Sequence, residues 1–270
     1  MVSTLARTQS VGRAAARWGQ TWWRILHLGS LLGALALSPS SWRQPWRAAI
    51  AARVWRSSAP LLPGFSLLIT LVSLVIMRIV LVTALSYGLS QYALQMVVRV
   101  LVLELIPLTA ALFVALRVSL PSSVELAELR SRDSLSALRQ AGRDVLRMEI
   151  LPRAVGSFFA VLLLAALSGV ICLVLAYLVV HGFSPWGLER YTRTVGQVFS
   201  PSVSLIFVLK ALAMALAVSI IPIGSALHDR AAPPRGDAPA LSSGIELQGL
   251  VRMFAALLLI EMLSLMGNYI

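Results

Sequence analysis

Apolar residues along this chain are gathered into five long runs, which are separated by segments of very different length and charge. The runs cover about residues 61–84, 92–116, 158–180, 202–227 and 250–270. At a rise of about 1.5 Å per residue, each run can form a helix that crosses a hydrocarbon core about 30 Å thick. The pattern predicts an all-α integral membrane protein in which residues 61–270 form five transmembrane helices.

The segments between the runs differ in their arginine content. Eight arginines precede the first run, seven lie in residues 117–153 and two in residues 228–249. The turn at residues 86–91 has none, and residues 181–200 have two. Because arginine is enriched in cytoplasmic loops, the arginine-rich segments are predicted to be cytoplasmic. The N-terminus is then cytoplasmic, and after five spans the C-terminus lies on the opposite side.

Residues 1–60 have a character of their own, because they hold six of the seven tryptophans. Trp42, Trp46 and Ile50 recur at helical spacing among arginines, which predicts an amphipathic helix in the membrane interface. A secretory signal peptide is the alternative, since "ILHLGSLLGALALSPSS" has an apolar core and an Ala-x-Ala-like end. The long aromatic segment before that core and the arginines after it favour interfacial helices.

The composition agrees with a membrane protein and narrows its chemistry. Of 270 residues, 58% are apolar and 13% are charged, about half the charged fraction of soluble proteins. The single Cys172 and three widely separated histidines provide neither a disulfide nor a metal-ligand spacing. The sequence contains no G-x-x-x-x-G-K-[ST] motif, and its only lysine, Lys210, lies in the fourth run. This chain therefore has no P-loop for ATP.

Ionisable residues within the predicted spans are the main candidates for a functional site. A charge at the bilayer centre costs about 2.5–3.5 kcal/mol on insertion scales, so each needs a partner, a wet cavity or a reach to the surface. Counting from the outer span ends places four of them at similar depth, and Glu104 about a turn and a half further inward. The five residues are Arg78, Arg99, Glu104, Lys210 and Glu261.

This polar layer has two interpretations that the sequence leaves open. The first is a structural set of salt bridges whose long side chains snorkel outward. The second is a cavity whose cations bind an anionic lipid headgroup while apolar walls hold the acyl chains. The two can coexist.

Pro107 stands three residues after Glu104 in the second span. Proline has no N–H and crowds the carbonyl four residues earlier, here that of Leu103, which predicts a kink beside Glu104. Backbone groups freed at membrane depth are tolerated where protein or a water-lined cavity satisfies them. Glu104 is therefore predicted to face protein, and Pro107 either borders a binding cavity or only shapes helix packing.

The segment "LELIPLTAALFVALR", followed by "VSLPSSVELAELR", resembles the signature of the MlaE/YrbE permease family, the membrane subunit of MCE-associated ABC lipid transporters. The family pattern reads Arg-Glu-Leu-Gly-Pro, then Ala-Gly-Arg-Ala-Gly, then Glu-Ile-Gly-x-Met-Arg. "EILPRAVGSFF", Lys210 and the terminal "MGNYI" resemble further family features, so the resemblance covers nearly the whole chain. The positions that match the three motifs are Glu104, Leu105, Pro107, Ala115, Arg117, Glu125 and Arg130.

The chain departs from the family pattern mainly where the family has glycine. Glu261 also lies about one turn from the family's aspartate. Since glycines permit close helix approach, these differences bear on the substrate and the dimer contact more than on the fold. The positions that differ are Leu103, Ile106, Leu116, Ser119, Ala127 and Leu129.

The resemblance implies a non-catalytic permease subunit in the bacterial inner membrane, with a cytoplasmic N-terminus and a periplasmic C-terminus. It implies a dimer of cytoplasmic ABC ATPases, a periplasmic MCE-domain protein and a second permease copy, identical or paralogous. ATP and Mg²⁺ would be bound by the ATPase, and this chain would hold no cofactor and no nucleic acid. The implied cargo is phospholipid or a related lipid, moved between inner membrane and carrier in support of outer-membrane lipid homeostasis.

Residues 117–153 offer the place where an ATPase would dock. Between Ala127 and Arg147, leucines and valines interleave with opposite charges, as in a short helix that presents one face to a partner. An amphipathic helix on the membrane surface is the alternative, and the resemblance favours a coupling helix. The expected contacts are Glu125, Glu128, Arg130, Arg132 and Asp133.

Other functions have weaker support in the sequence. An ion-coupled secondary transporter could use Glu104 and Glu261, but five unequal spans show no internal repeat of the kind common in such folds. A membrane-embedded enzyme would need a catalytic or metal-binding constellation, and none has workable spacing. A scaffold that does not transport is a further alternative.

Overall fold

The computed structural model describes residues 2–39, 46–88, 90–132, 144–228 and 240–269, together with residues 135, 138, 140 and 142. This part of the chain is helical and contains no strand. Five helices are long and apolar enough to cross a membrane: Arg47–Ser86, Leu94–Ser131, Leu146–His181, Pro201–Leu227 and Gln248–Gly267. The predicted fold class, an all-α protein with five transmembrane helices, is therefore confirmed.

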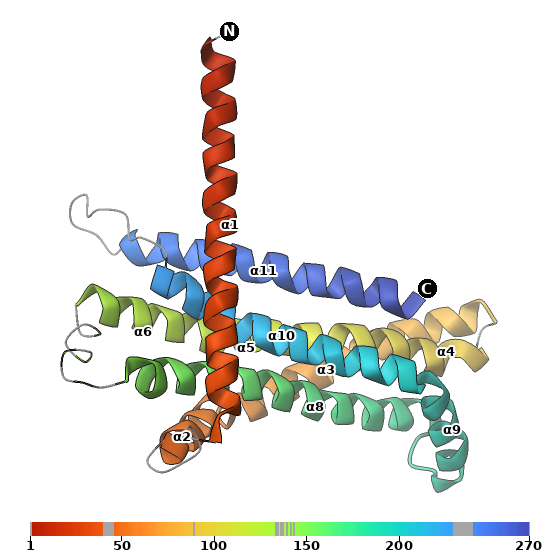
Figure 1. Cartoon of the computed structure of the whole chain (residues 1–270). Helices are drawn as coiled ribbons and strands as arrows, with labels where there is room; N and C mark the ends of the chain where they lie inside the picture. Colours follow the sequence, from red (N-terminus) through yellow and green to blue (C-terminus); the bar gives the residue numbers. More distant parts are fainter. Residues whose placement is uncertain are drawn as a thin grey trace.

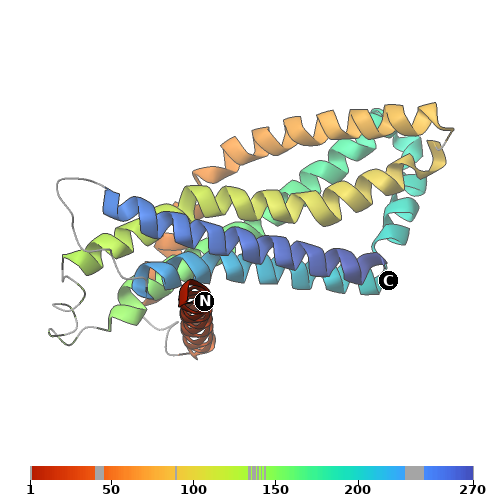
Figure 2. The ribbon, with the colours of Figure 1, turned by 90° about the horizontal axis from the view of Figure 1, so that it is seen from above.

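The N-terminal region forms two helices, α1 (Val2–Leu37) and α2 (Trp46–Ser58). Helix α1 stands roughly perpendicular to the long helices, and Figures 1 and 2 show it from the side and end-on. Its second half packs on α8 (Leu151–His181) and α10 (Pro201–His228) through the buried side chains of Ile25, Leu28 and Leu32. The apolar segment that resembled a signal peptide is thus part of the packed structure, whereas Trp42 lies outside the described residues.

The first two spans form a hairpin. Helix α3 (Leu61–Ser86) is followed by α4 (Ser90–Val97), the π-helical segment η2 (Val98–Leu105) and α5 (Ile106–Val114). A second π-helical segment, η3 (Ala115–Ser119), then leads into α6 (Leu120–Ser131).

The helix that contains the second span is longer than the sequence pattern indicated. Residues 117–131, expected to belong to a loop, continue this helix through η3 and α6. Pro121 does not stop it, because the π-helical η3 lies directly before α6, and a helix distortion of this kind accommodates a proline that has no N–H to donate. Apolar and small residues on one face of α6, such as Ser122 and Leu126, are buried against the bundle.

The remaining elements complete the bundle. The π-helical η4 (Leu146–Ile150) leads into α8, which ends before Gly182, a glycine with a φ of 64°. Residues 181–200, expected as a connection of low charge, contain the short 3-10 helix η5 (Pro185–Gly187) and α9 (Leu188–Val198). Helix α10 and α11 (Ala240–Tyr269) follow and run side by side (Figures 1 and 2).

Helix α8 is the centre of the packing, since it contacts α2, α3, α5 and α10. Its buried face is rich in small residues, which let neighbouring helix backbones approach closely. Gly156 is the clearest case, because a Cβ there would lie 2.9 Å from Ser57 Oγ and 3.3 Å from Arg53 Cγ of α2. Outward-facing leucines and valines of α3, α8 and α11 are exposed, as expected for helices that face lipid.

Candidate functional site

Three of the five predicted intramembrane charges meet in one ion-pair cluster, which we call the Lys210 triad: Lys210 on α10, Glu104 on η2 and Glu261 on α11. Lys210 Nζ forms a salt bridge with a Glu104 carboxylate oxygen and another, 2.9 Å long, with Glu261 Oε1. The side chains are 1%, 12% and 14% exposed, respectively. The triad therefore ties three segments of the bundle together away from solvent and lipid.

The Lys210 ammonium has no donor left in this conformation. An ammonium has three N–H groups. Lys210 Nζ donates to both carboxylates and also to the backbone carbonyl of Leu103, 3.2 Å away. A lipid phosphate can pair with Lys210 only after one of these acceptors has moved away.

The third acceptor, the carbonyl of Leu103, lies one helical turn before Pro107. In a regular α-helix the N–H of residue 107 would bond the carbonyl of Leu103; Pro107, which is buried, has no N–H, and this carbonyl accepts a hydrogen bond from Lys210. The expected distortion takes the form of the π-helical segment η2, which ends directly before α5, where Pro107 is the second residue. Glu104 lies within η2 and faces protein, as the sequence predicted.

Three of the five residues predicted to form the polar layer contact one another. Glu104, placed a turn and a half inward by residue counting, contacts the same ammonium as Glu261. The long lysine side chain and the widened turns of η2 bridge this offset. Arg78 on α3 has an exposed side chain and, within the described residues, no acidic group within 4 Å. Arg99 on η2 is also exposed.

A second cluster of charges joins three helices near the start of α8, and we call it the Glu125 cluster. Glu125 on α6 lies 3.7 Å from Arg53 of α2 and 3.7 Å from Arg153 of α8. Arg53 also donates to Ser122 Oγ of α6 at 3.0 Å, and Arg153 pairs with Glu149. Glu125, expected to contact a partner protein, thus has partners within its own chain, although its side chain is 57% exposed.

The other predicted coupling residues lie on or just after α6. Glu128, Arg130 and Arg132 are exposed. Arg130 Nη1 donates to the carbonyl of Ala226 at 3.2 Å, in the last turn of α10, where a cation is favoured by the helix dipole. Asp133 lies outside the described residues.

Sequence reasoning did not single out Arg153, and it assigned Arg53 only to the membrane interface. Two local signals were available. Glu149 and Arg153 are four residues apart, a spacing that pairs charges on a helix, and Gly156 follows on the next turn. The glycine permits the close approach of α2 that brings Arg53 to Glu125.

The arrangement pairs charges between helices. Within the described residues, no group of three or more His, Cys, Asp or Glu side chains is placed to hold a metal ion. The triad has two carboxylates for one ammonium, a net charge of −1 when both carboxylates are ionised. Such a cluster can hold helices together, and it can release them when a competing charge enters.

Comparisons with known proteins agree with this picture. The family described as Permease MlaE matches residues 50–267, which include both clusters and all five membrane-spanning candidates except the first turn of α2. No curated protein matches the chain.

Proposed function

The chain belongs to the MlaE permease family, and on this premise we propose that it moves phospholipid between the inner membrane and a periplasmic MCE-type carrier. As a member of this family, the chain is a multi-pass membrane protein and a permease subunit of a lipid-transporting ABC system. The proposal adds the cargo, the carrier and a contribution to outer-membrane lipid homeostasis. It also adds a second permease copy, and the orientation with N-terminus cytoplasmic and C-terminus periplasmic.

The observation that carries the proposal is the closed Lys210 triad. A phospholipid headgroup contains a phosphate, which can pair with an ammonium. The only lysine of the chain, Lys210, is paired with two carboxylates within the membrane-spanning region. We propose that opening of the triad exposes Lys210 to the phosphate, and that Arg78, Arg99 and Pro107 border the resulting site. The salt bridges then stabilise the empty permease, and headgroup binding uses the same side chains.

Energy for opening would come from a separate polypeptide. A dimer of cytoplasmic ABC ATPases would bind ATP and Mg²⁺, since this sequence has no P-loop. Glu128 and Arg132, at the end of α6, are proposed to contact the ATPase together with Asp133. The Glu125 cluster would transmit its movement to α2 and α8, because Glu125 faces an arginine on each of them.

The test begins with purification in mild detergent, which should recover an ATPase in equal amount with the chain. In proteoliposomes, the complex should move phospholipid to an MCE-domain acceptor only when ATP is present. Glu104→Gln, Lys210→Ala and Glu261→Gln should each reduce the transport rate. Glu189→Gln is the matched control, because Glu189 on α9 has a 90% exposed side chain.

The results would decide between the proposal and its alternatives. Full transport in all three triad variants would leave the triad purely structural. Recovery of the chain without any nucleotide-binding partner would contradict the ATP-driven permease. The two carboxylates around one ammonium are the observation that favours an ion-coupled transporter, and lipid movement driven by a proton gradient without ATP would establish it.

A further inference from the structure

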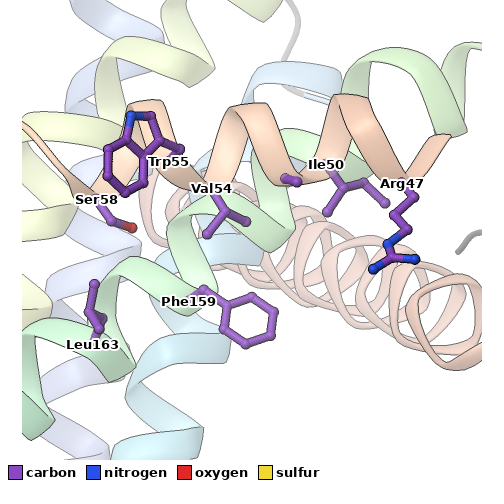
Figure 3. Close-up of a pocket in the computed structure, with 8 residues that line it drawn as sticks. Arg47, Ile50, Val54, Trp55, Ser58, Phe159 and Leu163 are labelled. Carbon is purple, nitrogen blue, oxygen red and sulfur yellow. The ribbon is translucent and has the colours of Figure 1, made fainter. Parts of the chain in front are cut away.

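A groove of about 420 Å³ lies between α2 and α8. None of the Lys210 triad residues lines it. Figure 3 shows α2 along one side, with Arg47 at one end and Leu163 of α8 at the other. Phe159 of α8 lies between these ends, opposite Ile50 and Val54. The volume falls within the range of about 300–1,000 Å³ that is typical of small-ligand sites.

The lining of this groove is almost entirely apolar apart from its end at Arg47. Arg47 is exposed and, within the described part of the chain, has no acidic group within 4 Å. The other two arginines of α2 are engaged: Arg53 with Glu125 and Ser122, and Arg56 with the carbonyl of Ala52. Arg47 is therefore the cation of α2 that is available to a ligand in this groove.

The position of the groove on a membrane-spanning helix indicates the kind of ligand that it can bind. Helix α8 spans the membrane, and Phe159 and Leu163 are 43% and 45% exposed on its outward face. Leu163 lies twelve residues, about 18 Å, from the start of α8, so this end of the groove lies well inside the span. A cation at the polar end of an apolar groove in a membrane fits the phosphate and the acyl chain of one phospholipid.

We propose that the groove between α2 and α8 binds one anionic glycerophospholipid from the adjoining leaflet. Its phosphate pairs with Arg47, and one acyl chain lies along Val54, Phe159 and Leu163. Trp55, 73% exposed and also at the groove, lies beside the chain. This site is separate from the proposed transport site and does not depend on transport or on an ATPase.

Ser58 provides a test of the orientation of the lipid. Its hydroxyl lines the end of the groove away from Arg47, is buried and has no hydrogen-bond partner within the described residues. A hydrocarbon chain at that end needs no hydroxyl, so Ser58→Ala should leave lipid binding unchanged. Loss of binding in this variant would show that a polar group occupies that end, and would overturn the assigned orientation.

The experiment uses the full chain in nanodiscs of phosphatidylcholine that contain a small fraction of phosphatidylglycerol with a photoreactive diazirine on one acyl chain. After illumination, mass spectrometry should find the label concentrated on peptides that contain Val54, Phe159 and Leu163. Arg47→Gln should reduce this labelling about fivefold, the effect of losing one arginine contact with an anionic lipid surface. The same probe built on phosphatidylcholine should label the wild type weakly and be insensitive to Arg47→Gln.

Arg56→Gln is the matched control, because it removes the same charge from the same helix but from outside the groove. Its labelling should change less than twofold. Leu163→Trp, at a lipid-facing position that accepts a larger side chain, should fill the groove and abolish labelling by both probes, and Ala51→Trp should do the same. Equal losses in Arg47→Gln and Arg56→Gln, or label spread evenly over α3 and α8, would overturn the proposal in favour of general attraction to an arginine-rich helix.

Discussion

Lys210 donates a hydrogen bond to the backbone carbonyl of Leu103, and the N···O distance is 3.2 Å. Leu103 lies four residues before Pro107, whose missing N–H would have bonded this carbonyl in a regular α-helix. The same ammonium also pairs with Glu104 and Glu261. One ammonium, two carboxylates and a backbone carbonyl beside a helix distortion, from three separate segments, thus compensate one another at membrane depth.

The balance of charge in the triad predicts that its members are not equally important for folding. Lys210→Met leaves two buried carboxylates and the Leu103 carbonyl without their partner, and should lower the free energy of unfolding by about 3–5 kcal/mol. Glu104→Gln leaves one ammonium facing one carboxylate with no charge unpaired, so it should destabilise the protein much less than Lys210→Met. Thermal unfolding in detergent measures both. Equal destabilisation by the two variants would contradict this account of the triad.

Glu125 and Glu128 both lie on α6, yet the structure predicts different roles for them. Glu125→Gln removes the charge that faces Arg53 and Arg153, and should reduce the amount of lipid moved per ATP hydrolysed. Its effect on unfolding should be below about 1 kcal/mol, because the glutamate side chain is 57% exposed. Glu128→Gln, at an exposed position, should instead weaken ATPase binding. The measurements are coupled transport assays and pull-down titrations with each variant.

A loss of ATPase affinity in Glu125→Gln as large as that in Glu128→Gln would place both residues at the subunit contact. The charge-conserving variant Arg153→Lys provides a further check. It should retain part of the coupling, since lysine keeps the charge but lacks the planar guanidinium that contacts two carboxylates.

The docking of α1 depends on a glycine in α10. A Cβ at Gly224 would lie 2.9 Å from Ile25 Cγ1 of α1, so Gly224→Ala should displace α1 and destabilise the protein by about 1–3 kcal/mol. Gly33→Ala is the matched control, because a Cβ at Gly33 meets nothing within 4 Å. That variant should be neutral or slightly stabilising, since alanine favours helix over glycine. Limited proteolysis of α1 and thermal unfolding distinguish the two, and equal behaviour would mean that α1 does not rest on α10 as described.

Because of Tyr191 on α9, the free energy of unfolding should depend on pH in the alkaline range. Burial, and secondarily the charge of a Cys172 thiolate, raise the pKa of Tyr191 to about 12, while its hydroxyl donates to the Leu173 carbonyl at 2.7 Å. The neutral phenol is thus favoured in the folded state. This stabilisation is fully present below pH of about 10, the ordinary pKa of tyrosine, and is lost as pH rises through about 12.

Tyr191→Phe should therefore lower stability at neutral pH and weaken the alkaline decline between pH of about 10 and 12. Tyr87→Phe is the control, because Tyr87 is 77% exposed. Unfolding midpoints measured across this pH range provide the test. An unchanged alkaline decline in Tyr191→Phe would assign it to other groups.

The sequence alone determined the number of spans, the helical class and the family resemblance. These properties depend on local quantities: the length of each apolar run, the placement of arginines and the short motif around Glu104 and Pro107. The effect of Pro107 on Leu103 was also predictable, because proline acts on a carbonyl at a fixed distance along its own helix. Where the second span ends was not, because α6 continues with small buried residues that carry no strong hydropathy.

Only the tertiary structure decided which charges meet. Arg78, placed by counting at a depth like that of Lys210, is exposed on α3, while Glu104, placed about a turn and a half further inward, reaches the same ammonium as Glu261. Residue counting measures position along one helix, whereas contact depends on the rotation, tilt and spacing of several helices. For the same reason the sequence did not show that Glu125 pairs with Arg53 and Arg153 of its own chain. The contact with Arg53 depends on the close approach of α2 to α8 at Gly156.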